Sequence, residues 1–431
     1  MKAIVKAWTS LSLIKRILIG LIIGALIGLF GPKDLIVVEL LGTLFVNALK
    51  AVAPLLVFFL VINALSRTKL PKSMRTVITL YVISTLCAAL TAVVASFAFP
   101  VTITLAEAGE AEAIPSDIGE VLMTLLNNMV ANPVDALVNA NYLGILVWAI
   151  VLGIAMRYTS EATRDFFSNI SHAISAIVRW VIACAPFGIL GLIYTSVSQN
   201  GPEIFIEYGQ LLAILLGCMF FAALVVNPLL VFLNIRKNPY PLVFRCLKDS
   251  GITAFFTRSS AANIPVNMEL CRRLGLHKDT YSVAIPLGAT VNMAGAAVTI
   301  SVMTMAACHT LGITVDPVTA VILCVLAAVS ACGASGVAGG SLMLIPLCCS
   351  LFGIGNDIAM QVVGIGFVIG VIQDSVETAI NSSSDALFSA TADYKERRKV
   401  GVDFQPGKDS PEWKSELEEA ASKEEAIAAE G

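Results

Sequence analysis

Charged residues are scarce in this chain. Asp, Glu, Lys and Arg make up only 14% of its 431 residues, whereas 57% are hydrophobic. Soluble globular domains carry about 25% charged residues, so the composition excludes an ordinary soluble protein and predicts a polytopic membrane protein. The net charge of −3 offers no strongly basic surface, and we expect no nucleic-acid partner.

Histidines and cysteines do not occur in the patterns that metal or redox centres require. The three histidines are scattered, and the ten cysteines include no CxxC pair. Most cysteines lie in apolar runs, where they are typical small core residues. Residues 333–336 (GASG) are similar to the nucleophile motif of intramembrane serine proteases, but no histidine follows His309 to serve as the base. We therefore expect neither an enzyme nor a bound cofactor.

Long hydrophobic runs are abundant. They predict membrane-spanning helices over residues 11–30, 35–64, 76–104, 141–157, 170–198 and 207–234. No small-residue cleavage site follows the first run, which is therefore interpreted as a transmembrane helix and not as a signal peptide. Basic loops after the second, fourth and sixth spans alternate with acidic loops, and the positive-inside rule places the N-terminus in the cytoplasm.

The apolar segments beyond residue 250 are interrupted by polar and glycine-rich stretches. Residues 257–265 (TRSSAANIP) break one segment, and residues 330–341 (SACGASGVAGGS) break another. Non-helical backbone at membrane depth is tolerated only where protein or a wet cavity surrounds it. The sequence therefore predicts two helical hairpins, followed by spans 278–306 and 356–390. The units 240–306 and 315–390 have a similar layout, as inverted repeats of a secondary transporter would.

The last predicted span carries a polar face. Asp374, Thr378, Asn381 and Asp385 follow one another at intervals of four, three and four residues, so they share one side of an α-helix. An ionised Asp at the bilayer centre costs about 2.5–3.5 kcal/mol on the insertion scale. Two such carboxylates are therefore expected to face protein, water or an ion, and they predict a permeation or transport site.

Two more stretches offer groups for an anion and for a cation. Residues 258–260 (RSS) lie at the tip of the first broken segment, where side chains and freed N–H groups suit a carboxylate. Residues 288–295 (GATVNMAG) interrupt the next helix. They are compatible with a close helix-packing seam or with an unwound turn that binds a cation. The side-chain oxygens of Asn292, Asn381 and Asp385 suit a hard cation such as sodium.

These motifs resemble those of the dicarboxylate/amino acid:cation symporters, the family of the archaeal aspartate and animal glutamate transporters. The specific matches are Thr257–Ser260, Pro286–Met293 and the face from Asp374 to Asp385. With residues 13–20 (LIKRILIG), the resemblance extends over most of the chain. Within the family, the chain is similar to the bacterial sodium symporters of serine and threonine.

The resemblance implies a glutamate-transporter-like fold with eight transmembrane helices and two re-entrant hairpins, assembled as a homotrimer in the lipid bilayer. Residues 1–240 would be mainly the fixed trimer scaffold, except that the third helix, about 76–104, would belong with the transport domain. Residues 241–393 (hairpin 1, helix 7, hairpin 2 and helix 8) would form the core transport domain, which moves as an elevator. Residues 394–431 would be a charged cytoplasmic tail, and the membrane would be the bacterial inner membrane.

The resemblance also implies two sets of ligands. The set for the amino-acid substrate is Arg258, Ser259, Ser260, Gly336, Asp374, Glu377, Thr378 and Asn381. The set for the coupling sodium ions is Gly288, Thr290, Asn292, Ser330, Ala331, Gly333, Asn381 and Asp385. Ser260 would meet the substrate carboxylate, and Asp374 would meet its α-ammonium group. One sodium ion would lie near Asp385, and a second would use backbone near Thr290 and in residues 330–333.

Departures from the family pattern predict the substrate. Members that carry acidic substrates have an arginine at the position of Glu377 and a threonine at that of Ala296. A substrate side-chain carboxylate would meet the like charge of Glu377, which is costly in a dry site. We therefore expect sodium-driven import of serine and threonine, and of alanine less well. Arg258 either neutralises Asp374 or Glu377 or replaces the missing arginine, which would make the chain a carrier of acidic amino acids or dicarboxylates.

A further departure concerns ion coupling. The family's Asn-Met-Asp-Gly is replaced by residues 292–295 (NMAG), although Tyr81, Ser84 and Thr85 match the helix that completes a third sodium site. We therefore expect fewer coupled sodium ions than in glutamate carriers. Two alternatives stay open: proton coupling through the carboxylates of the last span, and an ion channel, because a polar stripe would also suit a pore.

Overall fold

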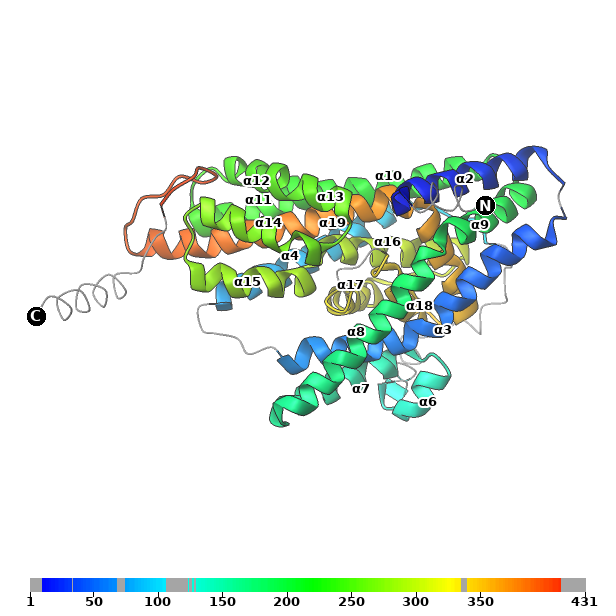
Figure 1. Ribbon diagram of the computed structural model, residues 1–431, viewed down its shortest axis with the longest axis horizontal. Helices are drawn as coiled ribbons and strands as arrows, with labels where there is room; N and C mark the ends of the chain where they lie inside the picture. Colours follow the sequence, from blue (N-terminus) through cyan, green and yellow to red (C-terminus); the bar gives the residue numbers. More distant parts are fainter. Residues whose placement is uncertain are drawn as a thin grey trace, which may run out of the picture.

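The computed structural model describes residues 10–32, 34–67, 74–105, 123, 126–127, 129–334 and 339–411. Every regular element among these residues is helical (Figure 1). Six helical stretches in this part of the chain are long and apolar enough to cross a membrane: residues 36–63, 75–98, 161–183, 204–235, 278–310 and 356–399. Two shorter apolar helices cover residues 142–158 and 317–331. The expectation of an all-helical chain with many spans is confirmed.

One group of helices packs around α3 (Ile36–Arg67). Its other members are α2 (Leu13–Phe30), α6 (Pro133–Val138), α7 (Tyr142–Ala155) with the short turn η2 (Met156–Tyr158), α8 (Glu161–Ala183) and α9 (Ala185–Asn200). α3 contacts α7, α8 and α9, and α2 lies along α9. The contact of α2 with α9 requires glycine, because a Cβ added at Gly20 would collide with the carbonyl oxygen of Pro186. α3 and α8 cross the long axis of the molecule at an angle (Figure 1).

The span predicted over residues 170–198 is wrong in its bounds. Two helices lie there, α8 and α9, and they meet at Cys184. α8 begins early because Ser160 caps it, accepting a hydrogen bond from the N–H of Thr163 at 3.3 Å. α9 begins at the break because Pro186, in its first turn, has no N–H to continue the ladder of the preceding helix.

A second group of helices packs around α19 (Asn356–Lys399). It contains α4 (Arg75–Ala98), α10 (Ile204–Phe221), α11 (Asn227–Ile235), α12 (Tyr240–Cys246), α13 (Ile252–Thr257), α14 (Ser260–Arg273), α15 (Lys278–Val291), α16 (Ala294–Thr310), α17 (Pro317–Ala331) and α18 (Ile345–Ser350). The π-helical turn η3 (Ala222–Val226) joins α10 to α11, and a second one, η4 (Leu247–Gly251), joins α12 to α13. In Figure 1, α11 to α14 lie alongside α19.

Helices from both sides of residue 240 belong to this second group. α4 contacts α10, α16 and α17, and α10 contacts α16 and α19. α4 also ends earlier than predicted, at Ala98, because Pro100 disfavours a helical conformation in the residue before it. The functional division into a scaffold and a transport domain stays a prediction.

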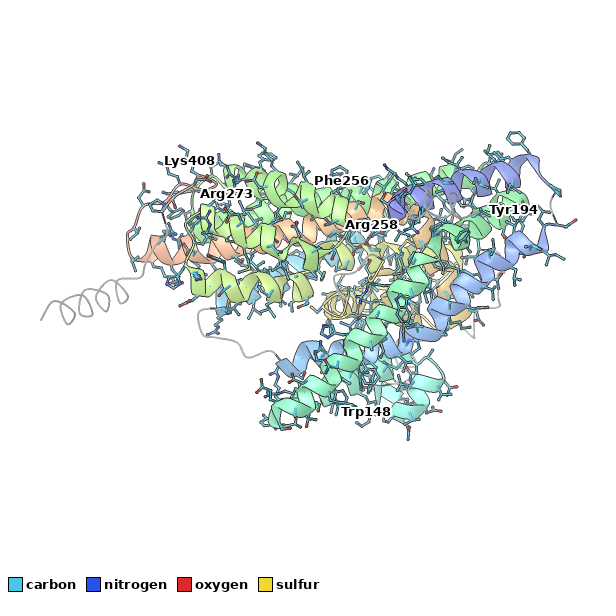
Figure 2. The ribbon with its side chains drawn as sticks, in the orientation of Figure 1. Trp148, Tyr194, Phe256, Arg258, Arg273 and Lys408 are labelled. Atoms are coloured by element: carbon cyan, nitrogen blue, oxygen red, sulfur yellow. The ribbon has the colours of Figure 1, made fainter. Side chains whose placement is uncertain are left out.

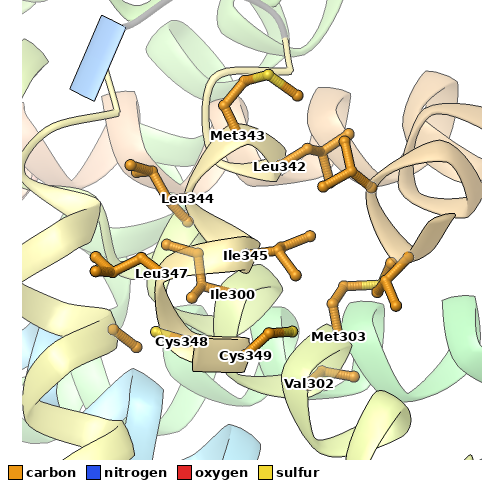
Figure 3. Packing of buried hydrophobic residues seen from close by; sticks show 14 of the residues in the cluster. Ile300, Val302, Met303, Leu342, Met343, Leu344, Ile345, Leu347, Cys348 and Cys349 are labelled. Atoms are coloured by element: carbon orange, nitrogen blue, oxygen red, sulfur yellow. The ribbon is translucent and has the colours of Figure 1, made fainter. Parts of the chain in front are cut away.

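The two predicted hairpins are present. Hairpin 1 consists of α12, η4 and α13 in one arm and α14 in the other, and the chain reverses at Arg258. Hairpin 2 consists of α17 in one arm and of η5 (Leu342–Leu344) and α18 in the other. The second arm of hairpin 2 is buried against α16, and Figure 3 shows Ile345 of this arm beside Ile300 of α16. Apolar packing thus holds the second arm of hairpin 2 against α16.

The chain after α19 folds back onto the base of hairpin 1. α19 continues to Lys399, beyond the predicted end at residue 390, and residues 400–411 follow as a strap. Within the strap, the ring of Phe404 stacks on Tyr394, with centroids 4.8 Å apart. The first part of the predicted tail 394–431 is therefore packed on the helices, and its residues from 412 on lie outside the described residues.

The strap is tied to both arms of hairpin 1. The N–H of Ser410 donates to the carbonyl of Arg273 at 3.0 Å, at the end of α14. The guanidinium of Arg245 in α12 pairs with Asp409 at 2.8 Å. Figure 2 shows Arg273 and Lys408 together at this end of the molecule, whereas Arg258, at the hairpin tip, lies far from it.

Candidate functional site

The tip of hairpin 1 reaches the middle of α19. α13 ends at Thr257, Arg258 adopts a left-handed conformation with φ 52°, and Ser259 caps α14 by accepting a hydrogen bond from the Ala262 N–H at 3.2 Å. This reversal directs Arg258 at α19. Its Nε donates to Oδ2 of Asp374 at 2.6 Å.

The ion pair between Arg258 and Asp374 is buried. Arg258 is only 9% exposed and Asp374 only 2%, and the guanidinium also donates to the carbonyl of Gly370 at 3.2 Å. A buried pair of this kind becomes strongly unfavourable when either partner is removed, because a charge is left without compensation. The structure thus pairs Arg258 with Asp374, and the role of Arg258 toward a substrate stays a prediction.

Hairpin 2 meets the same carboxylate from the other side. The N–H of Gly339 donates to Oδ1 of Asp374 at 3.2 Å. Gly339 has a φ of 74°, and an added Cβ would lie 2.8 Å from the ring of Phe367, so only glycine fits here. Asp374 thus joins the tips of both hairpins. The predicted ligand Gly336 lies in residues 335–338, outside the described part of the chain.

Glu377 lies one helical turn further along α19 and is also buried, at 5% exposure. Its Oε2 accepts hydrogen bonds from Thr299 at 2.7 Å, from Ser341 at 2.8 Å and from Gln373 at 2.5 Å. Thr299 belongs to α16 and Ser341 to hairpin 2, so three elements meet at this carboxylate. These three donors are absent from the predicted site. The sequence offers one signal for these donors, namely Gln373, a glutamine in a predicted span one helical turn before Glu377.

Helix α15 is separated from α16 by an unwound turn. Asn292 and Met293 have non-helical backbone angles, as the second of the two alternatives for residues 288–295 predicts. The freed N–H of Gly295 donates to Oδ1 of Asn381 at 2.7 Å. Asn292 donates to Oδ1 of Asp385 at 2.9 Å. The unwound turn therefore faces the polar side of α19.

Two buried oxygens in this region lack a hydrogen-bond partner among the described residues: Oδ1 of Asn292 and Oδ2 of Asp385. Neither residue is more than 1% exposed. A buried carboxylate oxygen that accepts no hydrogen bond is costly unless a cation compensates it. An amide oxygen and a carboxylate oxygen are ligands that a hard cation prefers, so the residues fit a sodium ion.

Gly288 leaves space beside this carboxylate. A Cβ added there would lie 2.5 Å from Oδ1 of Asp385 and 2.7 Å from the hydroxyl of Tyr81. Tyr81 comes from α4 and donates to the carbonyl of Ala284 at 3.1 Å. Glycine at 288 is therefore required for the backbone of α15 to approach Asp385 closely.

The residues predicted for a second sodium ion are brought together only in part. The thiol of Cys332 lies 3.4 Å from the carbonyl of Val291, which places the start of the hairpin 2 loop next to the end of α15. Ser330 and Ala331 are buried, and the carbonyl of Ser330 accepts a hydrogen bond from Gly333 at 2.7 Å. The side chain of Thr290 is exposed and donates to the carbonyl of Leu287.

Ser260 and Thr378, the remaining predicted positions, are both buried. On α4, two hydroxyls that the resemblance relates to a third sodium site are already engaged by the protein: Ser84 donates to Asn227 of α11 at 2.7 Å, and Thr85 donates to the carbonyl of Tyr81 at 2.8 Å. Ala294 brings no carboxylate to them.

Two broken hairpins that converge on a buried charged face of a long helix define a secondary transporter embedded in the membrane. Its family can be stated directly. The model of the sodium:dicarboxylate symporter family matches residues 13–394, and the chain belongs to this family. Members of this family are symporters, not enzymes.

Curated relatives cover nearly the whole chain. A protein of Streptococcus thermophilus named serine/threonine transporter SstT is 57% identical over 402 residues, which are 93% of this chain and 100% of the relative. A protein of Streptococcus agalactiae with the same name is 58% identical over 396 residues, which are 91% of this chain and 98% of the relative.

Proposed function

We propose that this protein is a sodium-coupled symporter that imports serine and threonine. The relatives carry the name of serine/threonine transporters at 57–58% identity, and the family is one of sodium symporters. The observation that carries the substrate proposal is the buried acidic group at Glu377, together with the pairing of Arg258 to Asp374. The guanidinium of Arg258 is thus already engaged by Asp374 and Gly370 and is not held ready for a substrate side-chain carboxylate.

The substrate would bind with its α-ammonium group at Asp374 and its carboxylate at the start of α14, near Ser259 and Ser260. The positive end of a helix dipole and freed N–H groups favour a carboxylate there. Thr378 and Asn381 would complete the contacts. An acidic side chain about 4 Å from Glu377 would be disfavoured by about 4 kcal/mol at an effective dielectric constant of about 20, which supports neutral substrates.

Sodium coupling would arise because ion and substrate share residues. Asn292 donates to Oδ1 of Asp385 and lies 3.3 Å from the carbonyl of Asn381. Oδ1 of Asn381 in turn accepts a hydrogen bond from the N–H of Gly295. A sodium ion at Asp385 would thus order the turn that also positions Asn381 for the substrate. The affinity for each solute would rise when the other is bound.

The second group of helices would move against the first as an elevator in a homotrimer. Lys50 of α3 pairs with Asp357 of α19 across the boundary between the groups, in exposed surroundings where an ion pair contributes little. The same boundary holds a cavity of about 400 Å³ lined by polar groups such as Thr43, Asn47 and Gln361. A polar boundary between two packed units favours relative motion. We place the protein in the bacterial inner membrane with both termini cytoplasmic.

The test is uptake of labelled serine into proteoliposomes under an inward sodium gradient at fixed pH. Unlabelled threonine should compete and aspartate should not. Strong competition by aspartate would mean that Arg258 leaves Asp374 and binds an acidic substrate. Uptake driven by a proton gradient without sodium would assign the coupling to protons.

A further inference from the structure

The two oxygens of Glu377 have unequal surroundings. Oε2 accepts all three hydrogen bonds, from Thr299, Ser341 and Gln373. None of these three hydrogen bonds goes to Oε1. An ionised carboxylate has about four acceptor positions, two on each oxygen. One oxygen is therefore fully used by the protein, and the other keeps its acceptor capacity.

The three donors also fix the orientation of the carboxylate. Nε2 of Gln373 lies 2.6 Å from the hydroxyl oxygen of Thr299 and 2.5 Å from Oε2 of Glu377, and Gln373 is completely buried. The single proton of Thr299 can go to the carbonyl of Gly295 at 3.2 Å or to Glu377 at 2.7 Å, and the shorter, charge-assisted bond is favoured. The backbone of Gly295 packs closely against the side chain of Glu377, since an added Cβ at Gly295 would lie 3.0 Å from Cγ of Glu377.

We propose that Gln373, Thr299 and Ser341 are positioning residues that turn Oε1 of Glu377 toward the substrate, where it accepts the hydroxyl of a β-hydroxy amino acid. This inference rests on the proposed function and deepens it. Asp374 and Glu377 lie three residues apart on one helix, so their side chains are about 5–6 Å apart at Cβ. An amino acid whose ammonium group meets Asp374 has its β-carbon substituent within reach of Glu377.

Ser341 makes this recognition depend on hairpin 2. It follows Gly339, which donates to Asp374, by two residues. Hairpin 2 therefore supplies a donor to each of the two carboxylates. Alanine would lose one charged hydrogen bond and be carried less efficiently.

The experiment compares serine with alanine, which differ by one oxygen atom. We expect Ser341→Ala and Gln373→Leu to lower the ratio of kcat/KM for serine to that for alanine by about tenfold, the loss of one hydrogen bond to a charged group. Thr299→Val should behave alike, and Thr299→Ser should keep the ratio of the unmodified protein. Thr304→Val is the matched control, because Thr304 is buried on the same helix and its hydroxyl makes no hydrogen bond to Glu377.

The outcomes separate the two levels of the proposal. If the unmodified protein takes up serine with sodium but Ser341→Ala lowers serine and alanine uptake equally, or changes neither, the positioning role is wrong and the proposed function stands. If the unmodified protein shows no sodium-driven serine uptake, both fall. Ser341→Ala removes a single oxygen near the hairpin tip, and it decides the question even where Gln373→Leu fails to fold.

Discussion

Replacing Asp385 by asparagine separates the charge of the proposed sodium site from its shape. The two side chains have nearly the same size, so packing is retained. Asp385 is 1% exposed, its Oδ1 accepts from Asn292 at 2.9 Å, and its Oδ2 has no partner among the described residues. The substitution removes the negative charge and leaves one amide oxygen as a ligand.

The expected effect is large because the site is dry. A sodium ion about 4 Å from a unit negative charge gains about 4 kcal/mol at an effective dielectric constant of about 20. This energy corresponds to a factor on the order of 1,000 in affinity. We therefore expect the sodium concentration for half-maximal serine uptake to rise by a factor on the order of 100 to 1,000 in Asp385→Asn. The serine KM at saturating sodium should change far less.

Thermal unfolding gives an independent readout. A ligand that binds only the folded state raises its stability in proportion to the logarithm of ligand concentration. The unmodified protein should therefore melt at a higher temperature as sodium is added, and in Asp385→Asn this dependence should weaken, because one of the two expected sodium sites is lost. Without sodium, the variant should be at least as stable as the unmodified protein, because a buried charge has been removed.

Asp357→Asn is the matched control. Asp357 lies at the start of the same helix, is highly exposed and pairs with Lys50 at the boundary between the two groups of helices. Exposed ion pairs contribute about 0–1 kcal/mol, so sodium dependence should change less than about fivefold. An unchanged sodium dependence in Asp385→Asn would refute the assignment and place the ion elsewhere.

Three further substitutions test the site and the fold. Gly288→Ala should lower sodium affinity at least about tenfold, because the added Cβ would lie 2.5 Å from Oδ1 of Asp385. Gly217→Ala is the control and should leave sodium affinity unchanged, because an added Cβ there has nothing within 4 Å. Equal effects of the two substitutions in sodium titrations would contradict the prediction. Glu377→Arg should make aspartate a competitor of serine uptake, and an unaltered competition profile would refute the selectivity argument. Phe404→Ala should lower stability by about 3 kcal/mol while leaving the serine KM unchanged; an unchanged melting temperature would mean that the strap contributes no stability.

Local patterns in the sequence were sufficient for much of the site. The spacing of Asp374, Thr378, Asn381 and Asp385 identified the polar face of α19, because a helix repeats every 3.6 residues. Polar and glycine-rich interruptions identified both hairpins, because such stretches cannot face lipid, and they left an unwound turn at Asn292 as one of two alternatives. These features depend on neighbours in the chain, which a single sequence displays.

Contacts between distant segments were not predictable in the same way. Glu377 accepts from Thr299, which is 78 residues away, and from Ser341, which is 36 residues away. Each of these residues has an ordinary place in its own helix or loop, and only the packing of three elements brings them together. The strap was missed for a related reason: residues 400–411 are short and polar, so they lack the apolar period that marks a packed element.

The central claim is that sodium and serine cross the membrane together, coupled through the turn that joins Asp385 to Asn381. The most direct measurement follows radiolabelled sodium and labelled serine simultaneously in the same proteoliposomes. Sodium entry should require serine, serine accumulation should require sodium, and the two fluxes should keep a fixed ratio as either concentration changes. Sodium entry without serine would indicate a channel, and serine accumulation without sodium would contradict the coupling.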